Sequence, residues 1–155
     1  MAEAEHPDTH RAAFHGAKLF LTHRDHMLVY LRDDTPGLPF PAFWDLPGGG
    51  REGEESPLDC ARRELAEEFG LDLPAARLRG HVFPSAAAPG HVSWLFTGRL
   101  SAAEIAAVRF GSEGQEWHMM RVAHYLMHPR AIPHFCRWIA ALPQVAVSKG
   151  MPLTE

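Results

Sequence analysis

The chain has 155 residues, of which 46% are hydrophobic and 22% charged, and this composition is typical of one globular domain with a sizeable core. A net charge of −4 and a pI near 6.2 give no basic footprint for long nucleic acid, and no apolar run is long enough to span a membrane. The two cysteines, Cys60 and Cys136, lie far apart, and the first residues lack the basic and apolar segments of a signal peptide, so we expect a reduced, cytoplasmic protein.

The first third of the chain is expected to contain an arm and three strands. Residues 1–13 are polar and aperiodic, which predicts a flexible arm. Two apolar runs at 17–23 and 27–31 flank a short polar turn and predict a β-hairpin. A loop rich in turn residues then leads to a short strand at 42–46, which a glycine loop at 48–50 follows.

A helix is predicted over residues 57–69. Ser56 suits the N-cap, Pro57 suits the first helical position, Asp59 completes a capping-box pattern, and Gly70 is a natural stop. At 100° per residue, four apolar side chains form one stripe that should face a core. These are Leu58, Ala61, Leu65 and Phe69.

The rest of the chain predicts a second hairpin, a short helix, a strand and a last helix. Alternating segments at 77–83 and 91–100 should pair as a hairpin. A capping-box signal predicts a short helix at 101–108, a further strand is expected at 117–122, and the last helix at 129–142. The buried face of that last helix is expected to comprise Ile132, Phe135, Cys136, Ile139 and Leu142.

This order of elements predicts an α/β fold with a mixed β-sheet packed between helices. We expect one domain at 14–143, between the arm at 1–13 and a tail at 144–155. No internal repeat or linker divides the chain.

Three glutamates lie on an arc beside the apolar stripe of the predicted helix 57–69, namely Glu64, Glu67 and Glu68. Like charges at this spacing repel one another, at a cost of a few tenths of a kcal/mol for each pair. A divalent cation such as Mg²⁺ or Mn²⁺ would reverse the sign, because hard cations take oxygen ligands. The arc is therefore either a metal-facing surface, with Glu68 exposed toward the metal, or an ordinary solvated face with weak surface ion pairs.

The wider pattern resembles the Nudix box. That signature is a Gly, five residues, a Glu, seven residues, Arg-Glu-aliphatic, any residue, Glu-Glu, any residue and Gly-aliphatic. The residues that match every fixed position and spacing are Gly49, Glu55, Arg63, Glu64, Leu65, Glu67, Glu68, Gly70 and Leu71. The preceding residues 44–48 also look like the usual lead-in of the family. Nine fixed positions over residues 49–71 are far more specific than a single short glycine motif.

The resemblance implies a Nudix-type α/β/α sandwich in which the box forms a loop, a helix and a loop at one edge of the sheet. It further implies that Glu64, Glu67 and Glu68 hold Mg²⁺ or Mn²⁺, with the backbone carbonyl near Gly48 as an additional ligand. Such ions clamp phosphate oxygens and activate water.

The resemblance also implies that Arg63 and Glu55 pair and fix the loop against the helix, although Arg63 could instead contact a phosphate. The general base is either Glu64 or a glutamate from a distant loop. The loop before the strand at 117–122 offers Glu113 and Glu116, of which we favour Glu113; the alternative is that this loop is a mere turn.

The function implied is metal-dependent hydrolysis of a phosphoanhydride in a nucleoside diphosphate derivative. A small-molecule nucleotide is the expected partner, first a nucleoside triphosphate that releases pyrophosphate, then a nucleotide sugar or ADP-ribose. A non-catalytic nucleotide-sensing module is the alternative, which the intact box glutamates oppose. Nudix proteins are commonly dimers, so a homodimer is compatible with the resemblance. Trp44 and Trp94 could stack on a base, but a buried tryptophan more often belongs to a core.

Overall fold

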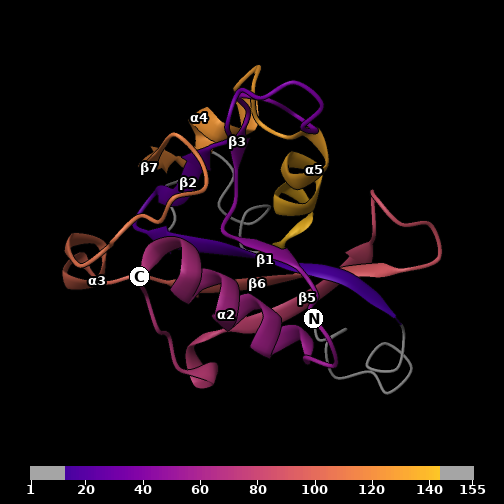
Figure 1. Cartoon of the computed structure of the whole chain (residues 1–155). Helices are drawn as coiled ribbons and strands as arrows, with labels where there is room; N and C mark the ends of the chain where they lie inside the picture. Colours follow the sequence, from indigo (N-terminus) through magenta and orange to yellow (C-terminus); the bar gives the residue numbers. More distant parts are fainter. Residues whose placement is uncertain (1–12, 144–155) are drawn as a thin grey trace.

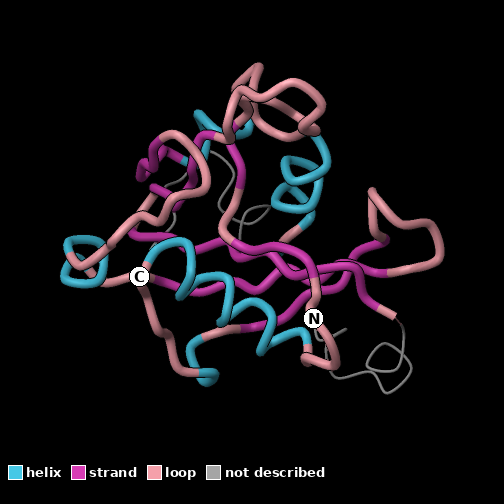
Figure 2. Tube along the Cα trace, in the orientation of Figure 1, coloured by secondary structure: helices cyan, strands magenta, loops and turns pink. Residues whose placement is uncertain are grey.

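Strand β1 (Phe14–His23) runs through the centre of a seven-stranded mixed sheet in the computed structural model, which describes residues 13–143. The strand order is β3-β2-β1-β6-β5, with β4 paired to β1 and β7 paired to β2 (Figures 1 and 2). Strands β1 and β6 are parallel, and the other pairs are antiparallel. The remaining elements in chain order are β2 (His26–Leu31), β3 (Trp44–Asp45), β4 (Gly48–Gly50), α2 (Pro57–Phe69), the 3₁₀ helix η2 (Ala75–Arg77), β5 (Arg79–Pro84), β6 (Val92–Arg99), α3 (Ala102–Ala106), β7 (Glu116–Arg121), α4 (Val122–Met127) and α5 (Pro133–Ala141).

Strands β1 and β2 separate soon after the turn that joins them. They pair only next to that turn, at Thr22–Met27 and His23–His26. Farther from the turn, β1 pairs with β4 and β2 pairs with β3, so the segment 44–50 fills the opening between the two strands. Its three glycines, which were expected to form a loop, therefore form a short strand, and sheet hydrogen bonds hold this segment on both sides.

Helices cover both faces of the sheet. Successive side chains of a strand point to opposite faces, and β1 accordingly contributes to two cores. Ala17, Leu19 and Leu21 pack with α2 on one face, whereas Phe20 packs with α4 and α5 on the other (Figure 1). The predicted α/β/α sandwich is confirmed. Within residues 13–143, no helix is long and apolar enough to cross a membrane.

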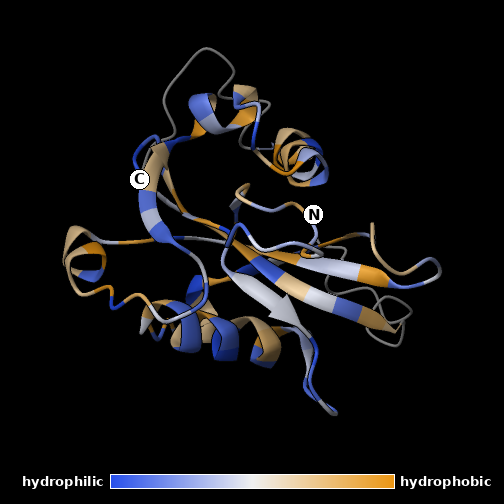
Figure 3. Ribbon diagram, turned by 45° about the horizontal axis from the view of Figure 1, so that its top comes forward, coloured by the Kyte–Doolittle hydropathy of each residue, from blue (hydrophilic) through white to orange (hydrophobic). Residues whose placement is uncertain are grey.

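Helix α2 begins and ends where the sequence predicts. The Ser56 hydroxyl accepts the Asp59 N–H at 3.1 Å, and Gly70 ends the helix with φ +67°. Ala61 and Leu65 are fully buried, as is Phe69, and Leu58 is partly buried, so the predicted stripe faces the core. Coloured by hydropathy, α2 carries both hydrophobic and hydrophilic residues, as an amphipathic helix should (Figure 3).

The last helical region differs from the prediction of one helix at 129–142. It consists of α4 and α5, which are separated by residues 128–132, where a turn lies at Pro129 and Arg130. His128 and Ile132 have extended backbones, and each precedes a proline. The residue before a proline is disfavoured in the helical region, which ends α4 at one position and delays α5 to Pro133 at the other. Of the expected buried face, Ile132, Phe135, Ile139 and Leu142 are buried, but Cys136 is only half-buried.

The other predicted elements are present with shifts of a few residues. The two hairpins correspond to β1–β2 and β5–β6, and the predicted strands at 42–46 and 117–122 correspond to β3 and β7. Helix α3 has the predicted capping box between Ser101 and Glu104. The expected arm, apart from Ala13, and the expected tail lie outside the described residues.

Candidate active site

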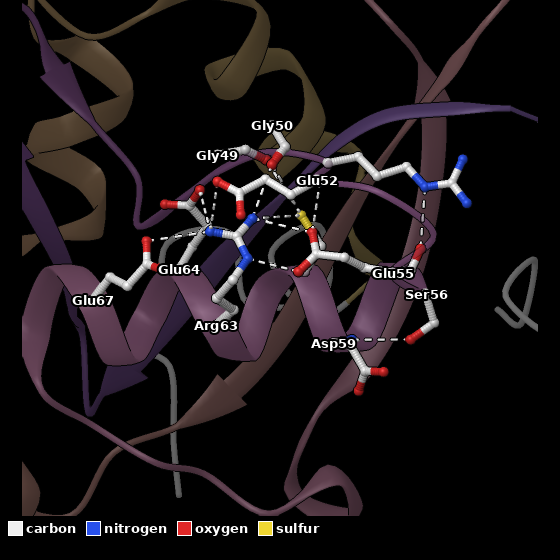
Figure 4. Close-up of polar contacts among 11 residues, drawn as sticks. Gly49, Gly50, Glu52, Glu55, Ser56, Asp59, Arg63, Glu64 and Glu67 are labelled. Atoms are coloured by element: carbon white, nitrogen blue, oxygen red, sulfur yellow. Dashed lines mark hydrogen bonds and ion pairs between the residues drawn. The ribbon is translucent and has the colours of Figure 1, made fainter.

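Arg63 joins the loop before α2 to the acidic side of the helix (Figure 4). Its Nε lies 2.6 Å from Glu55 Oε2, and its Nη2 lies 3.1 Å from Glu55 Oε1 and 3.0 Å from the Gly50 carbonyl oxygen. Its Nη1 contacts Glu64 at 3.1 Å and Glu67 at 3.2 Å. The hydrogen bond from Arg63 lowers the pKa of Glu55 to about 2. The pairing expected between Arg63 and Glu55 is present, and all three guanidinium nitrogens contact protein groups, which favours an orienting role over contact with a phosphate.

Glu64 lies directly against the glycine-rich segment. A Cβ atom at Gly49 would approach Glu64 Oε2 to 2.5 Å, so only glycine allows the carboxylate this position. The Glu64 side chain is 13% exposed, and burial raises its pKa, although Arg63 opposes the shift. Glu67 is 58% exposed. One carboxylate therefore contacts the loop, and its neighbour extends into solvent.

Glu68 is buried, so the expectation that it is exposed is wrong. Its Oε1 accepts the Gly48 N–H at 2.8 Å, and the residue is 6% exposed. At 100° per residue, position 68 falls about 20° from Ala61, inside the buried stripe rather than beside it. Burial raises the pKa of Glu68 to about 8, although Lys18 and the Gly48 N–H both lower it.

Gly48 forms hydrogen bonds through both its N–H and its carbonyl group. Its N–H donates to Glu68, and its carbonyl oxygen, the expected metal ligand, accepts from Lys18 Nζ at 3.1 Å. Gly48 has φ +126°, and a Cβ atom there would collide with the Ala17 carbonyl oxygen. Only glycine therefore presents this carbonyl in this direction.

A buried polar cluster behind Gly48 was not predicted. Asp45 is 1% exposed and accepts hydrogen bonds from Lys18 Nζ at 3.1 Å, Tyr30 Oη at 3.1 Å, Arg32 Nη1 at 2.9 Å and the Leu46 N–H at 2.7 Å. One sequence signal was available: Lys18 is the single charged residue in an apolar strand, and charges at such positions are usually paired.

The loop that carries Glu113 is attached to the C-terminal end of α2. The Gly111 N–H donates to the Glu68 carbonyl oxygen at 2.8 Å, which places this loop beside the acidic end of the helix. Glu113 is exposed, and within residues 13–143 no hydrogen bond or ion pair engages its carboxylate. Glu116 instead lies in β7 and pairs with His118 at 3.3 Å. Of the two candidate glutamates, Glu113 is thus the one whose carboxylate has no ion pair with another described residue.

A cavity of about 240 Å³ lies between β1, β4, the β5–β6 loop and α5. Phe135 and Trp138 give it aromatic walls, and Lys18 is the only lysine or arginine among its described lining residues. Neither tryptophan considered from the sequence lines it. Trp94 is buried in the core beneath α2, and Trp44 packs edge-on to a histidine of β7.

The box carboxylates suit a hard divalent cation by their chemistry. Burial raises the pKa of both Glu64 and Glu68, because their ionised carboxylates lose solvation, and a bound cation would stabilise the ionised forms. Oxygen donors of this kind are the ligands that Mg²⁺ prefers. In the described part of the chain, no three Asp, Glu, His or Cys side chains already converge on one point, because Glu68 turns to the Gly48 N–H while Glu64 and Glu67 turn to Arg63.

We expect the metal-free protein to lose stability as the pH rises from about 5 to 8, and the Glu68→Gln variant to lose less. Between the ordinary carboxyl pKa of 4.5 and the folded value of about 8, the folded protein retains a proton that the unfolded chain has released. This contribution therefore falls as the pH rises, by at most about 1.4 kcal/mol per pH unit, and is fully lost above the folded pKa. Urea unfolding of both proteins in a chelator, across this pH range, measures the difference. Parallel pH curves would contradict a buried, protonated Glu68.

Comparison with known proteins agrees with this geometry. The NUDIX domain model matches residues 10–139. Human diphosphoinositol polyphosphate phosphohydrolase 3-alpha is 40% identical over 57 residues, which cover 37% of this chain and 34% of that protein. The 8-oxo-dGTP diphosphatase of Proteus vulgaris is 42% identical over 45 residues, which cover 27% of this chain and 40% of that protein. The chain thus matches less than half the length of these curated relatives.

A solved structure extends the similarity to the whole fold. The MutT protein from Methanosarcina mazei Go1 superimposes with a TM-score of 0.64 at 18% identity, over 83% of this chain and 91% of that one. At this identity the likeness concerns the fold alone, whereas the family model covers most of the residues that build the sheet, α2 and α5. The chain belongs to the NUDIX domain family.

Proposed function

We propose that the protein is a metal-dependent hydrolase that cleaves a diphosphate linkage in a nucleoside diphosphate derivative, with a nucleoside triphosphate as its first substrate. The observation that carries this proposal is the position of Gly48. Its N–H contacts a box carboxylate, Glu68, and its carbonyl contacts Lys18, which lines the aromatic cavity. A substrate with a nucleoside in that cavity would have its phosphates beside the box.

Members of this family generally use divalent metal ions, and we propose Mg²⁺ or Mn²⁺ here. Glu64, Glu67 and Glu68 would hold the ion together with the Gly48 carbonyl. Such an ion, when bound, neutralises phosphate oxygens and lowers the pKa of water.

The chain's own residues supply orientation and proton transfer. Arg63 aligns Glu64 and keeps the loop against α2 through its bidentate pair with Glu55. Glu113 is our choice of general base, because its carboxylate is exposed on a loop tied to the acidic end of α2. Glu64 is the alternative base, and burial raises its pKa, which makes its carboxylate a stronger base.

The cavity favours a nucleoside over a more highly charged ligand. Aromatic walls suit a planar base, and stacking on such side chains tolerates any base. An inositol polyphosphate would instead need several cations, and Lys18 is the only lysine or arginine among the described lining residues. The name of the Proteus vulgaris relative, an 8-oxo-dGTP diphosphatase, supports a nucleoside triphosphate.

A substrate panel tests this function. Nucleoside di- and triphosphates, nucleotide sugars, ADP-ribose and dinucleoside polyphosphates are each incubated with Mg²⁺ and with Mn²⁺, and the products are identified by mass. We expect metal-dependent conversion of a nucleoside triphosphate to the monophosphate and pyrophosphate. Cleavage of a nucleotide sugar or ADP-ribose alone would show that this compound, and not a nucleoside triphosphate, represents the substrate class. No cleavage, with nucleotides still raising the melting temperature, would indicate a binding module.

A further inference from the structure

Lys18 lies where the cavity meets the glycine-rich segment. It shares a face of β1 with Phe20, on the side of the sheet that α5 covers. Its Nζ donates to Asp45 Oδ1 at 3.1 Å and to the carbonyl oxygens of Leu46 at 3.2 Å and Gly48 at 3.1 Å. The same ammonium lies 5.5 Å from the ring centre of Phe135, a cavity residue, and the side chain is 17% exposed. The Lys18 ammonium thus contacts both the segment 45–48 and the cavity.

An anion could displace one of the three acceptors that Lys18 contacts. Two of its three acceptors are neutral carbonyl groups, and the third, Asp45, also accepts from Arg32 and Tyr30. A phosphate oxygen is charged and forms a stronger hydrogen bond with an ammonium than a carbonyl does. Exchange of a carbonyl contact for a phosphate contact would leave Asp45 paired with Arg32.

We propose that Lys18 is a substrate-binding residue that contacts the phosphate attached to the nucleoside. This inference rests on the proposed function. The aromatic walls of the cavity take the nucleoside, while the glutamates of α2 repel its phosphates. Lys18 stands between these two regions, so its ammonium attracts the first phosphate and places the diphosphate beside the box.

The competing role is purely structural, because Lys18 could serve only to hold the segment 45–48. The two roles differ in their effect on the preference for a nucleoside 5′-monophosphate over the nucleoside itself. A substrate-binding lysine strengthens binding of a nucleoside 5′-monophosphate but not of the nucleoside itself, whereas loss of a structural lysine would disturb both ligands equally.

Binding measured by calorimetry in the absence of metal distinguishes the two roles. The probes are adenosine and guanosine with their 5′-monophosphates. The proteins are wild type, Lys18→Met, Lys18→Arg and the control Arg51→Met. The Arg51 side chain is exposed on the loop that follows β4 and does not line the cavity. We expect wild type and Arg51→Met to bind a monophosphate about tenfold more tightly than its nucleoside, the size of one charged hydrogen bond. Lys18→Met should lose this preference while still binding the nucleoside, and Lys18→Arg should retain part of it.

Either of two results with Lys18→Met would overturn the proposal. An unchanged preference in Lys18→Met would exclude the phosphate contact, and an equal loss for nucleoside and monophosphate would assign Lys18 to structure alone. If Lys18→Met does not fold, a Lys18→Arg protein with a reduced preference and the nucleoside bound normally would support the contact. A Lys18→Arg protein with an unchanged preference, or with both ligands weakened equally, would oppose it. If wild type binds none of the probes and the panel shows no nucleotide cleavage, the proposed function is wrong as well. If the panel shows cleavage but the variants keep an unchanged preference, only the role proposed for Lys18 is wrong.

Discussion

Glu64→Gln is expected to lower the turnover of the cleaved nucleotide by about 100-fold or more, the usual contribution of a group that transfers a proton or a ligand that holds the ion. Glutamine keeps the size of the side chain and still accepts a hydrogen bond from Arg63, so the loop should stay in place. It carries no charge for a cation and accepts no proton. The kcat measured at saturating metal gives the effect.

The melting temperature of Glu64→Gln should stay equal or rise. Burial raises the pKa of Glu64, which means that the ionised carboxylate weakens the folded state at neutral pH. A neutral side chain removes that cost, as is common where active sites sacrifice stability for function. Glu52→Gln is the matched control, because Glu52 is 70% exposed, lies 3.5 Å from Arg63 and is not a fixed position of the box. Near-normal turnover in Glu64→Gln, or equal loss in both variants, would remove Glu64 from the reaction.

Helix α2 could be predicted to the residue because its determinants are local. Ser56, Pro57 and Gly70 lie within one turn of its ends, and the apolar stripe needs only the helical period. The pairing between Arg63 and Glu55 was implied by the resemblance to the Nudix box, and it spans eight residues of one loop and helix. Both features depend on residues close together in the sequence and not on the pairing of the strands.

The features that the sequence did not reveal depend on the separation of β1 and β2. Only this opening brings the segment 44–50 over the end of α2, where Glu68 meets the Gly48 N–H and Lys18 meets Asp45. Asp45 and Lys18 are 27 residues apart in the sequence, which is too far for a local pattern to indicate the contact. The cluster around Asp45 could therefore not be predicted. The burial of Glu68, in contrast, follows from the helical period alone, although its partner at Gly48 does not.

Asp45→Ala is expected to lower the free energy of unfolding by about 3 kcal/mol, at the lower end of the range for a broken buried ion pair. Asp45 is 1% exposed, and its removal leaves Lys18, Arg32 and the Tyr30 hydroxyl without their common acceptor. Lys18 and Arg32 are 17% and 20% exposed, so water relieves part of their loss. Urea unfolding at neutral pH measures the change.

The matched control for Asp45→Ala is Asp72→Ala, which removes an ion pair with Arg62 from a side chain that is 85% exposed. Exposed pairs contribute about 1 kcal/mol or less, because water screens both charges. A large difference between the two variants would show that the opening between β1 and β2 is stabilised by the charges gathered on Asp45, as well as by the sheet pairing of β3 and β4. Equal, small effects would mean that sheet pairing alone holds the glycine segment in place, and that Lys18 and Arg32 find water or backbone acceptors when the carboxylate is gone.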